Sequence, residues 1–582
     1  MTFLPLRRYR ESHRADEPVL PALRDHLRSG GGTRPEELEA LSGRLGLPAA
    51  ALRGALSYYA DLRENVDAPR ICRGTSCELA GAERLAAALE AEEGWRPVYC
   101  LGYCDRSPAL LRDGRVCHGD AARATAGSGG GAFGESGGAP DAVPAAPAED
   151  GPRIRARGVE PIVTRRIGRG DFSDLADARG DGAYATLEAA LEEPPEAVLR
   201  AVELSGERGR GGAGFPTGRK WRTCAETPAD RRYVVANGDE GDPGSFIDRL
   251  LMERDPHGLL EGMALCARAV GADRGVVFVR SEYPRAEERL RSAVEEARAA
   301  GLLGEDVLGT GFAFDVSVFR AMGSYVCGEE TAMLNAIEGY RGEVRLRPPF
   351  PAERGLYGRP TVVNNVETLM NATFVVREGP EAYARLGTDA SSGTKALCLN
   401  HGFAEPGVLE VEFGASLREA IDEVGFAPGP EPKAILLGGP MGSVLTPGEW
   451  DVPICYGAMG ERGIQLGHGS LVAVPADASW TALLEHRLRF MADESCGRCV
   501  PCSRGSAAAL ERVRTAGRGG PGGGEGSGPR ENGGPAQPAR DREELDGLFD
   551  LIGQTSLCGF GTGMAPGLRR LLELAAGEEA AR

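Results

Sequence analysis

The chain has 582 residues, 42% of them apolar, and a formal net charge of −18 at pH 7. This length exceeds what one hydrophobic core usually organises, so several domains are expected. The acidic charge argues against nucleic acid as the main partner, because phosphate-binding surfaces are basic. The sequence holds no apolar run long enough to span a membrane and no signal peptide, so we expect a cytoplasmic protein.

The first domain is expected over residues 1–124 and begins with helices. Leucines recur at helical spacing over 36–62, which predicts a small helical bundle. Short apolar runs at 70–72 and 97–99 then flank a predicted helix at 81–93, which predicts a βαβ unit. Each of these runs leads into a pair of cysteines. The four cysteines are Cys72, Cys77, Cys100 and Cys104.

The cysteines indicate metal binding. Fourteen of them occur in a chain that we expect to be cytoplasmic, which favours thiolate ligation over disulfides. Four residues separate Cys72 from Cys77, and three separate Cys100 from Cys104. These spacings differ from the two-residue spacing typical of zinc ribbons. Taken alone, this N-terminal quartet fits zinc and a [2Fe-2S] cluster about equally.

A linker and an α/β domain follow. Residues 125–151 are mainly Gly, Ala, Ser, Pro and acidic residues, which cannot repay the entropy of folding and predict a flexible linker. Over 152–390, apolar strands alternate with helical segments such as 286–300, which is the signature of an α/β layer fold. The predicted strands are 233–236, 275–279 and 314–318.

Two glycine-containing segments of this domain could bind a ligand. The loop over 206–220 offers backbone amides without obstructing side chains, a cradle for phosphate or for a flat cofactor, with Lys220 as a cationic anchor. The turn over 237–244 follows a predicted strand, and α/β sheets bind ligands at the carboxyl ends of their strands. A surface linker and an acidic surface turn are the respective alternatives.

Two further clusters come later in the domain. Glu329 and Glu330 fall in the first turn of a predicted helix, where the helix dipole also favours acids. The segments 347–351 and 359–368 add Phe350 and two adjacent asparagines. The four clusters together place polar and aromatic side chains on one predicted sheet domain.

Two smaller domains complete the chain. Over 391–476, short apolar runs surround one helix at 417–424, which predicts a small α+β domain of ubiquitin-like size. A helical bundle is predicted over 477–582, with a Gly-rich insert at 515–540 that we expect to be disordered. The bundle carries three cysteines two residues apart and a remote fourth, the pattern of a [4Fe-4S] site, with zinc as the rival metal. These cysteines are Cys496, Cys499, Cys502 and Cys558.

Five motifs occur in order along the chain: GRGGAGFPTGRKW at 209–221, NGDEGDPG at 237–244, YVCGEET at 325–331, NNVET at 364–368 and ESCGRCVPC at 494–502. They resemble the NADH-oxidising flavoprotein subunit of respiratory complex I and the related diaphorase subunits of NAD-linked formate dehydrogenases and NAD-reducing hydrogenases. Residues 15–125 resemble the thioredoxin-like [2Fe-2S] partner of that subunit, so the chain looks like a fusion of the two.

The resemblance implies an α/β multidomain fold. In chain order we expect an N-terminal helical and thioredoxin-like [2Fe-2S] domain and an FMN- and NAD-binding α/β domain. A ubiquitin-like β-grasp domain of the SLBB type and a C-terminal helical bundle with a [4Fe-4S] cluster are expected to follow. The resemblance assigns the N-terminal cysteine quartet to the [2Fe-2S] cluster and the C-terminal quartet to the [4Fe-4S] cluster.

The resemblance also implies the residues that bind FMN and NAD. Phe215 and Phe350 are expected to stack on the NAD adenine. Glu330 and Asp242, the expected catalytic residues, would meet its nicotinamide or ribose groups. The implied flavin contacts are Gly209, Gly211, Gly212, Lys220, Asn237, Asp239, Glu240, Tyr325, Gly328, Glu329, Asn364 and Asn365.

The implied activity is that of a diaphorase, which moves a hydride between NAD(H) and FMN and single electrons to or from iron–sulfur clusters. No molybdenum, nickel or quinone site is recognisable, so other subunits are expected to carry the second active site. The segments 237–244 and 342–345 look more like formate dehydrogenases than like complex I, so a formate dehydrogenase is our first candidate, with a hydrogenase or complex I as alternatives. A rival from another class is a non-catalytic, zinc-stabilised binding scaffold built on the 395–475 region, which would be colourless.

Overall fold

The computed structural model describes residues 19–46, 48–62, 68–90, 95–119, 151–517 and 537–581. The predicted linker 125–151 lies outside the described residues except for its last position. The predicted insert 515–540 is shorter than expected, because α22 (Val500–Gly517) and α23 (Gln537–Thr555) enter it from both ends. The residues between these helices lie outside the described ranges.

The N-terminal part consists of helices followed by a four-stranded sheet of order β2-β1-β3-β4. Strands β1 (Arg70–Cys72) and β2 (Arg96–Val98) are parallel and α6 (Ala82–Glu90) connects them, which confirms the predicted βαβ unit. Cys72 ends β1 and Cys77 follows it, while Cys100 and Cys104 both follow β2. The remaining elements are α2 (Val19–Arg28), α3 (Pro35–Leu45), α4 (Ala49–Tyr58), α5 (Thr75–Leu79), β3 (Ala109–Arg112) and β4 (Arg115–His118).

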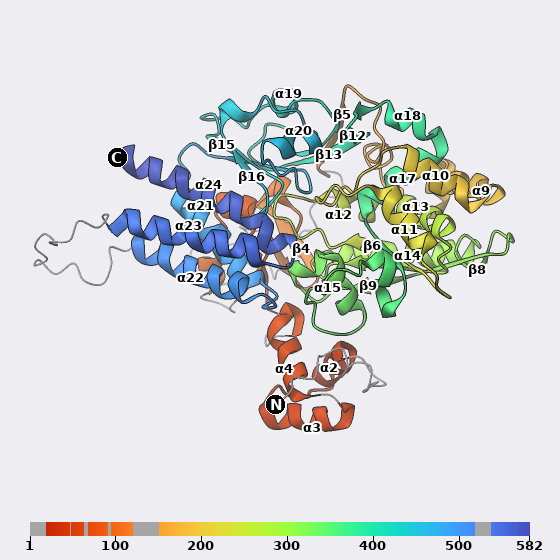
Figure 1. The fold of residues 1–582 in the computed structure, drawn as a ribbon, viewed down its shortest axis with the longest axis horizontal. Coiled ribbons are helices and arrows are strands. Elements are labelled where there is room, and N and C mark those ends of the chain that lie inside the picture. The colour runs from red at the N-terminus through yellow and green to blue at the C-terminus, as the bar shows by residue number, and fades with distance from the viewer. Residues whose placement is uncertain are drawn as a thin grey trace, which may run out of the picture.

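This N-terminal part is docked on the rest of the chain. The Tyr58 hydroxyl donates to the carbonyl of Gly342 at 2.6 Å. The Tyr99 hydroxyl donates to the Asp493 carboxylate at 2.9 Å. In Figure 1 helices α2 to α4 project below the α/β region, while β4 lies between that region and the C-terminal helices. The four cysteines of this part, Cys72, Cys77, Cys100 and Cys104, are buried in the folded chain.

The middle of the chain is built on a five-stranded sheet of order β10-β6-β7-β9-β8. The first four strands are parallel, and β8 is antiparallel to β9. Asn365 pairs with Asn237 in the register of β10 and β6, so two of the polar motifs meet at one edge of the sheet. The strands are β6 (Tyr233–Gly238), β7 (Arg274–Val279), β8 (Gly304–Val307), β9 (Phe312–Arg320) and β10 (Thr361–Asn365).

Helices cover this sheet, and several carry the motifs at their first turns (Figure 1). The short η3 (Tyr325–Gly328) leads into α15. Glu330 lies in the first turn of α15, as predicted, whereas Glu329 is the N-cap, one position before that turn. The helices are α8 (Leu175–Gly180), α9 (Ala185–Glu192), α10 (Pro195–Leu204), α11 (Thr217–Glu226), α12 (Ile247–Arg254), α13 (Pro256–Val270), α14 (Pro284–Ala299), α15 (Glu330–Ile337), α16 (Pro351–Arg354), α17 (Val366–Glu378) and α18 (Pro380–Ala384).

A six-stranded mixed sheet of order β16-β15-β17-β13-β14-β5 follows. Its edge strand β5 (Arg153–Arg157) pairs in parallel with β14, although the sequence boundary at 152 placed these residues in the α/β domain. Because three of its five residues are arginines, the segment lacks the apolar pattern by which strands are predicted. Charged side chains are typical of edge strands. The other elements are β13 (Thr394–Leu399), β14 (Gly407–Glu412), α19 (Leu417–Val424), β15 (Ala434–Leu437), β16 (Ser443–Leu445), α20 (Tyr456–Glu461) and β17 (Ser470–Val474), with a small hairpin of β11 (Gly387–Thr388) and β12 (Ser391–Ser392) before them.

The C-terminal part is a helical bundle of α21 (Trp480–Glu494), α22, α23 and α24 (Gly559–Ala581), at the left of Figure 1. The second cysteine quartet gathers at one end of these helices, in the α21–α22 junction and just before α24. Within the described residues, none of the helices combines the length and apolar character that crossing a membrane requires.

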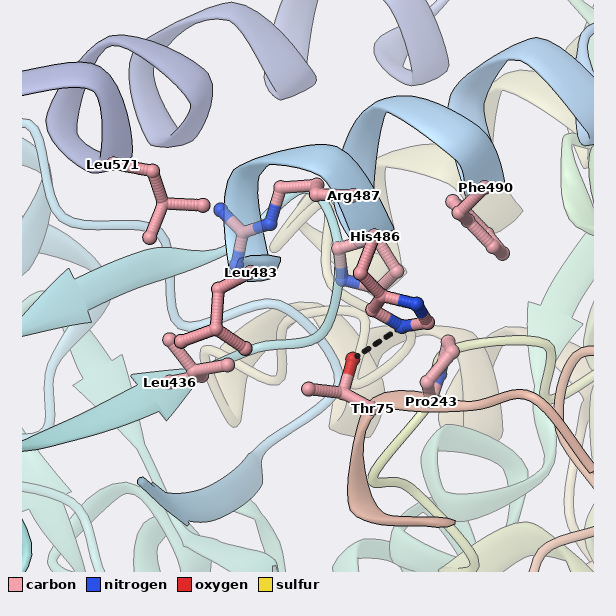
Figure 2. A pocket seen from close by; sticks show the side chains of 9 residues that line it. Thr75, Pro243, Leu436, Leu483, His486, Arg487, Phe490 and Leu571 are labelled. Atoms are coloured by element: carbon pink, nitrogen blue, oxygen red, sulfur yellow. Dashed lines mark hydrogen bonds between the residues drawn. The ribbon is translucent and has the colours of Figure 1, made fainter. Parts of the chain in front are cut away.

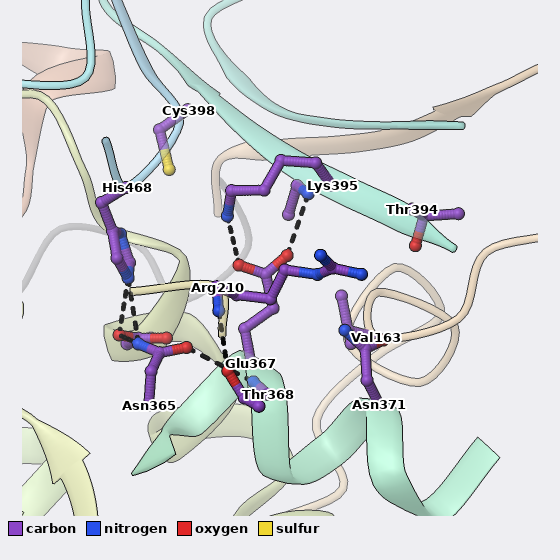
Figure 3. A network of polar contacts seen from close by, with 12 residues as sticks. Val163, Arg210, Asn365, Glu367, Thr368, Asn371, Thr394, Lys395, Cys398 and His468 are labelled. Carbon is purple, nitrogen blue, oxygen red and sulfur yellow. Dashed lines mark hydrogen bonds and ion pairs between the residues drawn. The ribbon is translucent and has the colours of Figure 1, made fainter. Parts of the chain in front are cut away.

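A fully buried ion pair joins the two sheet domains. Lys395 of β13 donates to Glu367 of α17, and Figure 3 shows this contact at the centre of a larger polar network. Breaking a buried pair leaves an uncompensated charge. We expect Lys395→Met to lower the free energy of unfolding by about 3 to 5 kcal/mol in urea titrations. Combining it with Glu367→Leu should restore most of the loss, and a double variant no more stable than Lys395→Met would contradict this account.

Candidate functional site

The glycine-rich loop lies between α10 and α11 and folds back on itself. The Gly209 amide donates to the Phe215 carbonyl at 2.9 Å. Gly212 has φ of +109°, and a Cβ there would lie 3.3 Å from the backbone of Gly467. A side chain is therefore disfavoured at Gly212 both by its backbone conformation and by the close approach of the six-stranded sheet domain. The absence of side chains leaves the amides of Gly211 and Gly212 unobstructed, as a phosphate or flavin cradle requires.

Arg210 anchors this loop from inside. Its guanidinium is fully buried and donates to Glu207 at 2.7 Å and to the Tyr383 hydroxyl at 2.6 Å. Its backbone amide donates to the Thr368 hydroxyl at 2.8 Å. This role was not predicted from the sequence, because a basic residue between glycines usually faces solvent or ligand.

Lys220 and Glu330 come together from segments far apart in the chain. The Lys220 ammonium donates to Glu330 at 3.1 Å and to the Val363 carbonyl at 2.8 Å. Arg347 approaches the other oxygen of Glu330 at 3.3 Å. The predicted cationic anchor and a predicted catalytic acid thus share one partly exposed corner, where an incoming anion could replace Glu330 as the partner of Lys220.

The acidic turn after β6 is tied to the third motif. The Asn237 amide donates to the Gly328 carbonyl at 2.9 Å. The Tyr325 hydroxyl donates to Asp242 at 2.5 Å. Burial raises the pKa of Asp242 above its ordinary value, while the hydrogen bond from Tyr325 opposes that rise. The two motifs therefore form one wall of the candidate site.

Three predicted flavin contacts point elsewhere in this structure. Both carboxylate oxygens of Glu240 accept backbone amides at the start of α12, from Asp248 at 3.1 Å and Arg249 at 2.9 Å. Glu329 likewise accepts the amides of the first turn of α15. Asn364 accepts a hydrogen bond from the Trp221 indole at 2.9 Å. These side chains support the walls of the site from behind.

The two predicted adenine-stacking rings are on the open side. Phe215 is 44% exposed and Phe350 is 51% exposed, although large aromatic side chains usually prefer burial. Arginine side chains lie over both rings, Arg219 at 5.8 Å from the Phe215 centroid and Arg347 at 6.0 Å from that of Phe350. An open aromatic face beside a guanidinium suits an anionic nucleotide.

His468 belongs to none of the five motifs, and it lies buried behind the candidate flavin cradle. Its Nε2 lies 3.0 Å from Asp248 and 3.0 Å from the Asn365 amide. Figure 3 shows His468 beside Asn365. Its Nδ1 lies 3.4 Å from Glu240. Burial lowers the pKa of His468, but the Asp248 and Glu240 charges outweigh burial and raise that pKa to about 9.

This histidine predicts a pH dependence of stability. The ordinary pKa of histidine is about 6.5, so the stabilisation is fully present below pH 6.5 and lost as the pH rises through 9. We expect the free energy of unfolding to fall by at most roughly 3 kcal/mol over that interval, because each pKa unit corresponds to about 1.4 kcal/mol. Burial also raises the pKa of Glu240 to about 7, which places its own contribution at lower pH. Urea titrations at several pH values should show a flatter profile for His468→Gln; equal slopes above pH 7 would refute this assignment.

The N-terminal cysteines form a compact group of buried free thiols. The sulfurs of Cys100 and Cys104 lie 3.4 Å apart, and Cys72 contacts both Cys77 and Cys100. The loop that carries Cys100 and Cys104 packs against the α/β domain, where Arg249 donates to the Gly102 carbonyl at 3.0 Å. Four thiols this close, with no disulfide among them, suit a metal cluster.

The C-terminal cysteines are a second group, in which Cys499 is partly exposed and the others are buried. Burial raises the pKa of Cys502 to about 11 and that of Cys558 to about 12. Thiolates at such positions need a cation to stabilise them, which a metal supplies. Tyr325 links this group to the candidate cradle: its amide donates to Glu494 at 2.9 Å, and its ring centroid lies 4.9 Å from that of Phe490.

The first cysteine loop, the acidic turn after β6 and the C-terminal helical bundle meet at a small cavity, shown in Figure 2. Thr75 comes from the first cysteine loop, Pro243 from the acidic turn and His486 from α21. The Thr75 hydroxyl and His486 Nε2 lie 3.4 Å apart. Burial lowers the pKa of His486 to about 3, so this histidine is neutral and contributes to the packing.

Comparison with known proteins bears on this arrangement. Three family models match: the Nuo51 FMN-binding domain over 202–373, the iron–sulfur binding region of NADH-ubiquinone oxidoreductase-F over 482–575, and the thioredoxin-like [2Fe-2S] ferredoxin over 6–126. An F-type NADH-quinone oxidoreductase subunit of Rhizobium meliloti is 39% identical over 420 residues, which cover 71% of this chain and 95% of that protein. The chain belongs to the family of F-type NADH-quinone oxidoreductase subunits. It is a flavin- and iron–sulfur-dependent NADH:acceptor oxidoreductase with FMN, NAD, [2Fe-2S] and [4Fe-4S] as its cofactors.

Relatives of this F-type chain include a hydrogenase subunit. A subunit of an NADP-reducing hydrogenase from Solidesulfovibrio fructosivorans is 40% identical over 408 residues, covering 69% of this chain and 79% of that protein. A crystal structure of an NAD+-reducing [NiFe]-hydrogenase in the H2-reduced state contains a chain that matches with a TM-score of 0.77 and 28% identity. That match covers 96% of this chain and 93% of the hydrogenase chain. Because iron–sulfur models match both cysteine-bearing regions, the zinc scaffold is not supported.

Proposed function

We propose that this chain is the NADH-oxidising subunit of a larger NAD-linked redox complex and that it holds FMN in the loop and turn described above. The observation that carries this proposal is the meeting of the glycine-rich loop, the acidic turn and the Tyr325 motif at the carboxyl ends of β6 and β10. The neighbouring cysteine groups are the proposed cluster sites, [2Fe-2S] on the N-terminal quartet and [4Fe-4S] on the C-terminal quartet. A cytoplasmic location is part of the same proposal.

The residues of the site have distinct tasks in this proposal. Bound FMN supplies a group that takes up a hydride and gives up electrons one at a time. Lys220 binds its phosphate, and the amides at Gly211 and Gly212 provide further donors.

The remaining residues orient the substrate. Phe215 and Phe350 stack on the adenine of NAD(H), and the Arg347 guanidinium binds the phosphates of NAD(H). Asp242, held by Tyr325, and Glu330 accept hydrogen bonds from ribose or nicotinamide groups and orient the nicotinamide toward the flavin.

The second active site lies on another protein of the complex in this proposal. Our first candidate is a formate-oxidising protein, on the strength of the 237–244 and 342–345 segments. A hydrogenase is the second candidate, favoured by the likeness of nearly the whole chain to the hydrogenase chain. Complex I is the third candidate for the larger complex.

Purification of the chain with its natural partners tests the proposal. Identification of the attached subunits should reveal a second redox enzyme. The isolated complex should reduce NAD+ when formate is added. NAD+ reduction with hydrogen instead would select the second candidate, and a chain that purifies alone, without flavin, would contradict both.

A further inference from the structure

Arg280 lies between the candidate flavin cradle and the candidate [2Fe-2S] site, and no motif of the sequence contains it. It follows β7, the central strand of the five-stranded sheet, and its side chain is 3% exposed. A buried charge acts on its surroundings through a medium of low dielectric, so its field is screened much less than that of a surface charge.

On one side this guanidinium holds the acidic turn. Its Nη1 donates to the Glu240 carbonyl at 2.6 Å, and its Nε lies 3.5 Å from Asp239. Burial raises the pKa of Asp239 well above its ordinary value, and the Arg280 charge opposes that rise. The second oxygen of Asp239 has no hydrogen-bond partner among the described residues, so it is available to a ligand.

On the other side the same guanidinium reaches the N-terminal part. Its Nη2 donates at 2.9 Å to the carbonyl of Tyr99, the residue before Cys100. The guanidinium charge therefore lies beside the loop that carries Cys100. Glu282 balances this charge in part, at 3.2 Å from Nη2.

We propose that Arg280 is a positioning residue that sets the reduction potential of the [2Fe-2S] cluster and fixes its loop against the flavin cradle. This inference rests on the proposed assignment of the two sites. Reduction adds one electron, derived from NADH, and hence one negative charge to the cluster. A buried guanidinium beside a cluster ligand stabilises that added charge, so it raises the reduction potential.

Two variants test the charge. In Arg280→Gln, redox titration of the intact, flavin-loaded protein followed by EPR should show the [2Fe-2S] signal appearing at lower potential. A tenfold weaker stabilisation of the reduced cluster corresponds to about 59 mV for a one-electron couple. In Glu282→Gln, which removes the balancing negative charge and nearly preserves shape, the same signal should appear at higher potential. The [4Fe-4S] signal should stay in place in both.

Two further variants separate charge from docking. Arg280→Lys keeps the charge and should retain most of the wild-type potential. Arg166 is the control, because its buried guanidinium pairs with Asp255 at 3.2 Å, away from the cysteine loops. Arg166→Gln should shift the [2Fe-2S] potential much less than Arg280→Gln.

The possible outcomes decide the inference. It is overturned if the [2Fe-2S] potential is unchanged in Glu282→Gln and in whichever Arg280 variants fold, or if Arg166→Gln and Arg280→Gln shift it equally. Should the wild type show neither FMN nor a [2Fe-2S] signal, the proposed function itself fails. Clusters and flavin present at wild-type potentials in every variant would leave that function standing and refute only the role of Arg280.

Discussion

Replacing Lys220 by alanine is expected to weaken FMN binding strongly. The ammonium reaches the candidate cradle beside Glu330 and the Val363 carbonyl, and the other two lysines of the chain lie elsewhere. Hydrogen bonds to charged groups contribute about 1.5 to 3 kcal/mol, so FMN affinity should fall roughly 10- to 100-fold. Fluorescence titration of the flavin-free protein with FMN measures this directly.

Lys433 provides the control for this experiment. Its ammonium lies 4.0 Å from the centroid of the Trp480 ring, in contact with the C-terminal bundle and not with the glycine-rich loop. Lys433→Ala should keep wild-type FMN affinity, and Lys220→Arg should recover part of it because the charge remains. Unchanged flavin binding in Lys220→Ala would show that the phosphate lies elsewhere.

Removing one sulfur of the C-terminal quartet should abolish the [4Fe-4S] cluster. Cys558 is buried between the bundle and the candidate cradle, and it is the quartet member remote in sequence. In Cys558→Ala we expect the EPR signal of this cluster to disappear while the [2Fe-2S] signal and the flavin remain. NADH oxidation by acceptors that take electrons from the cluster should be lost with it.

Cys266 is the matched buried cysteine outside both quartets. It lies within α13 and is fully buried. Cys266→Ala changes the same atoms and should keep both EPR signals and the full iron content. A Cys558→Ala protein that retains the [4Fe-4S] signal would contradict the ligand assignment.

Helices and strands were predicted well where the hydrophobic periodicity or the capping residues of the segment itself determine the structure. The helix predicted at 417–424 is α19, with the same limits, and Ser416 and Glu419 form a capping box at its start. The βαβ order of the cysteine domain and the strands β6, β7 and β9 were also predicted, because buried strands read as continuous apolar runs.

Side-chain direction was much harder to predict. Arg210 and Glu240 stand in motifs that suggest ligand contact, yet one anchors a loop from inside and the other caps α12. The direction of the Arg210 side chain depends on Tyr383, more than a hundred positions away. The direction of Glu240 depends on the path of the turn that leads into α12. Arg280 belongs to no motif, and only the folded chain brings it between Tyr99 and Asp239.

The interdomain contacts also lie beyond the sequence. Strand β5 joins its sheet through backbone hydrogen bonds to β14, about 250 positions away, which leave no pattern in side-chain type. Lys395 could be noticed as one of three lysines, but its pairing with Glu367 follows from how two sheets pack.

The most direct measurement is anaerobic reduction of the purified protein by NADH, followed by visible absorption and then by EPR. The account predicts bleaching of the flavin bands on addition of NADH and the subsequent appearance of signals from reduced iron–sulfur clusters. A protein that contains zinc in place of iron, shows no flavin absorption and does not respond to NADH would contradict it.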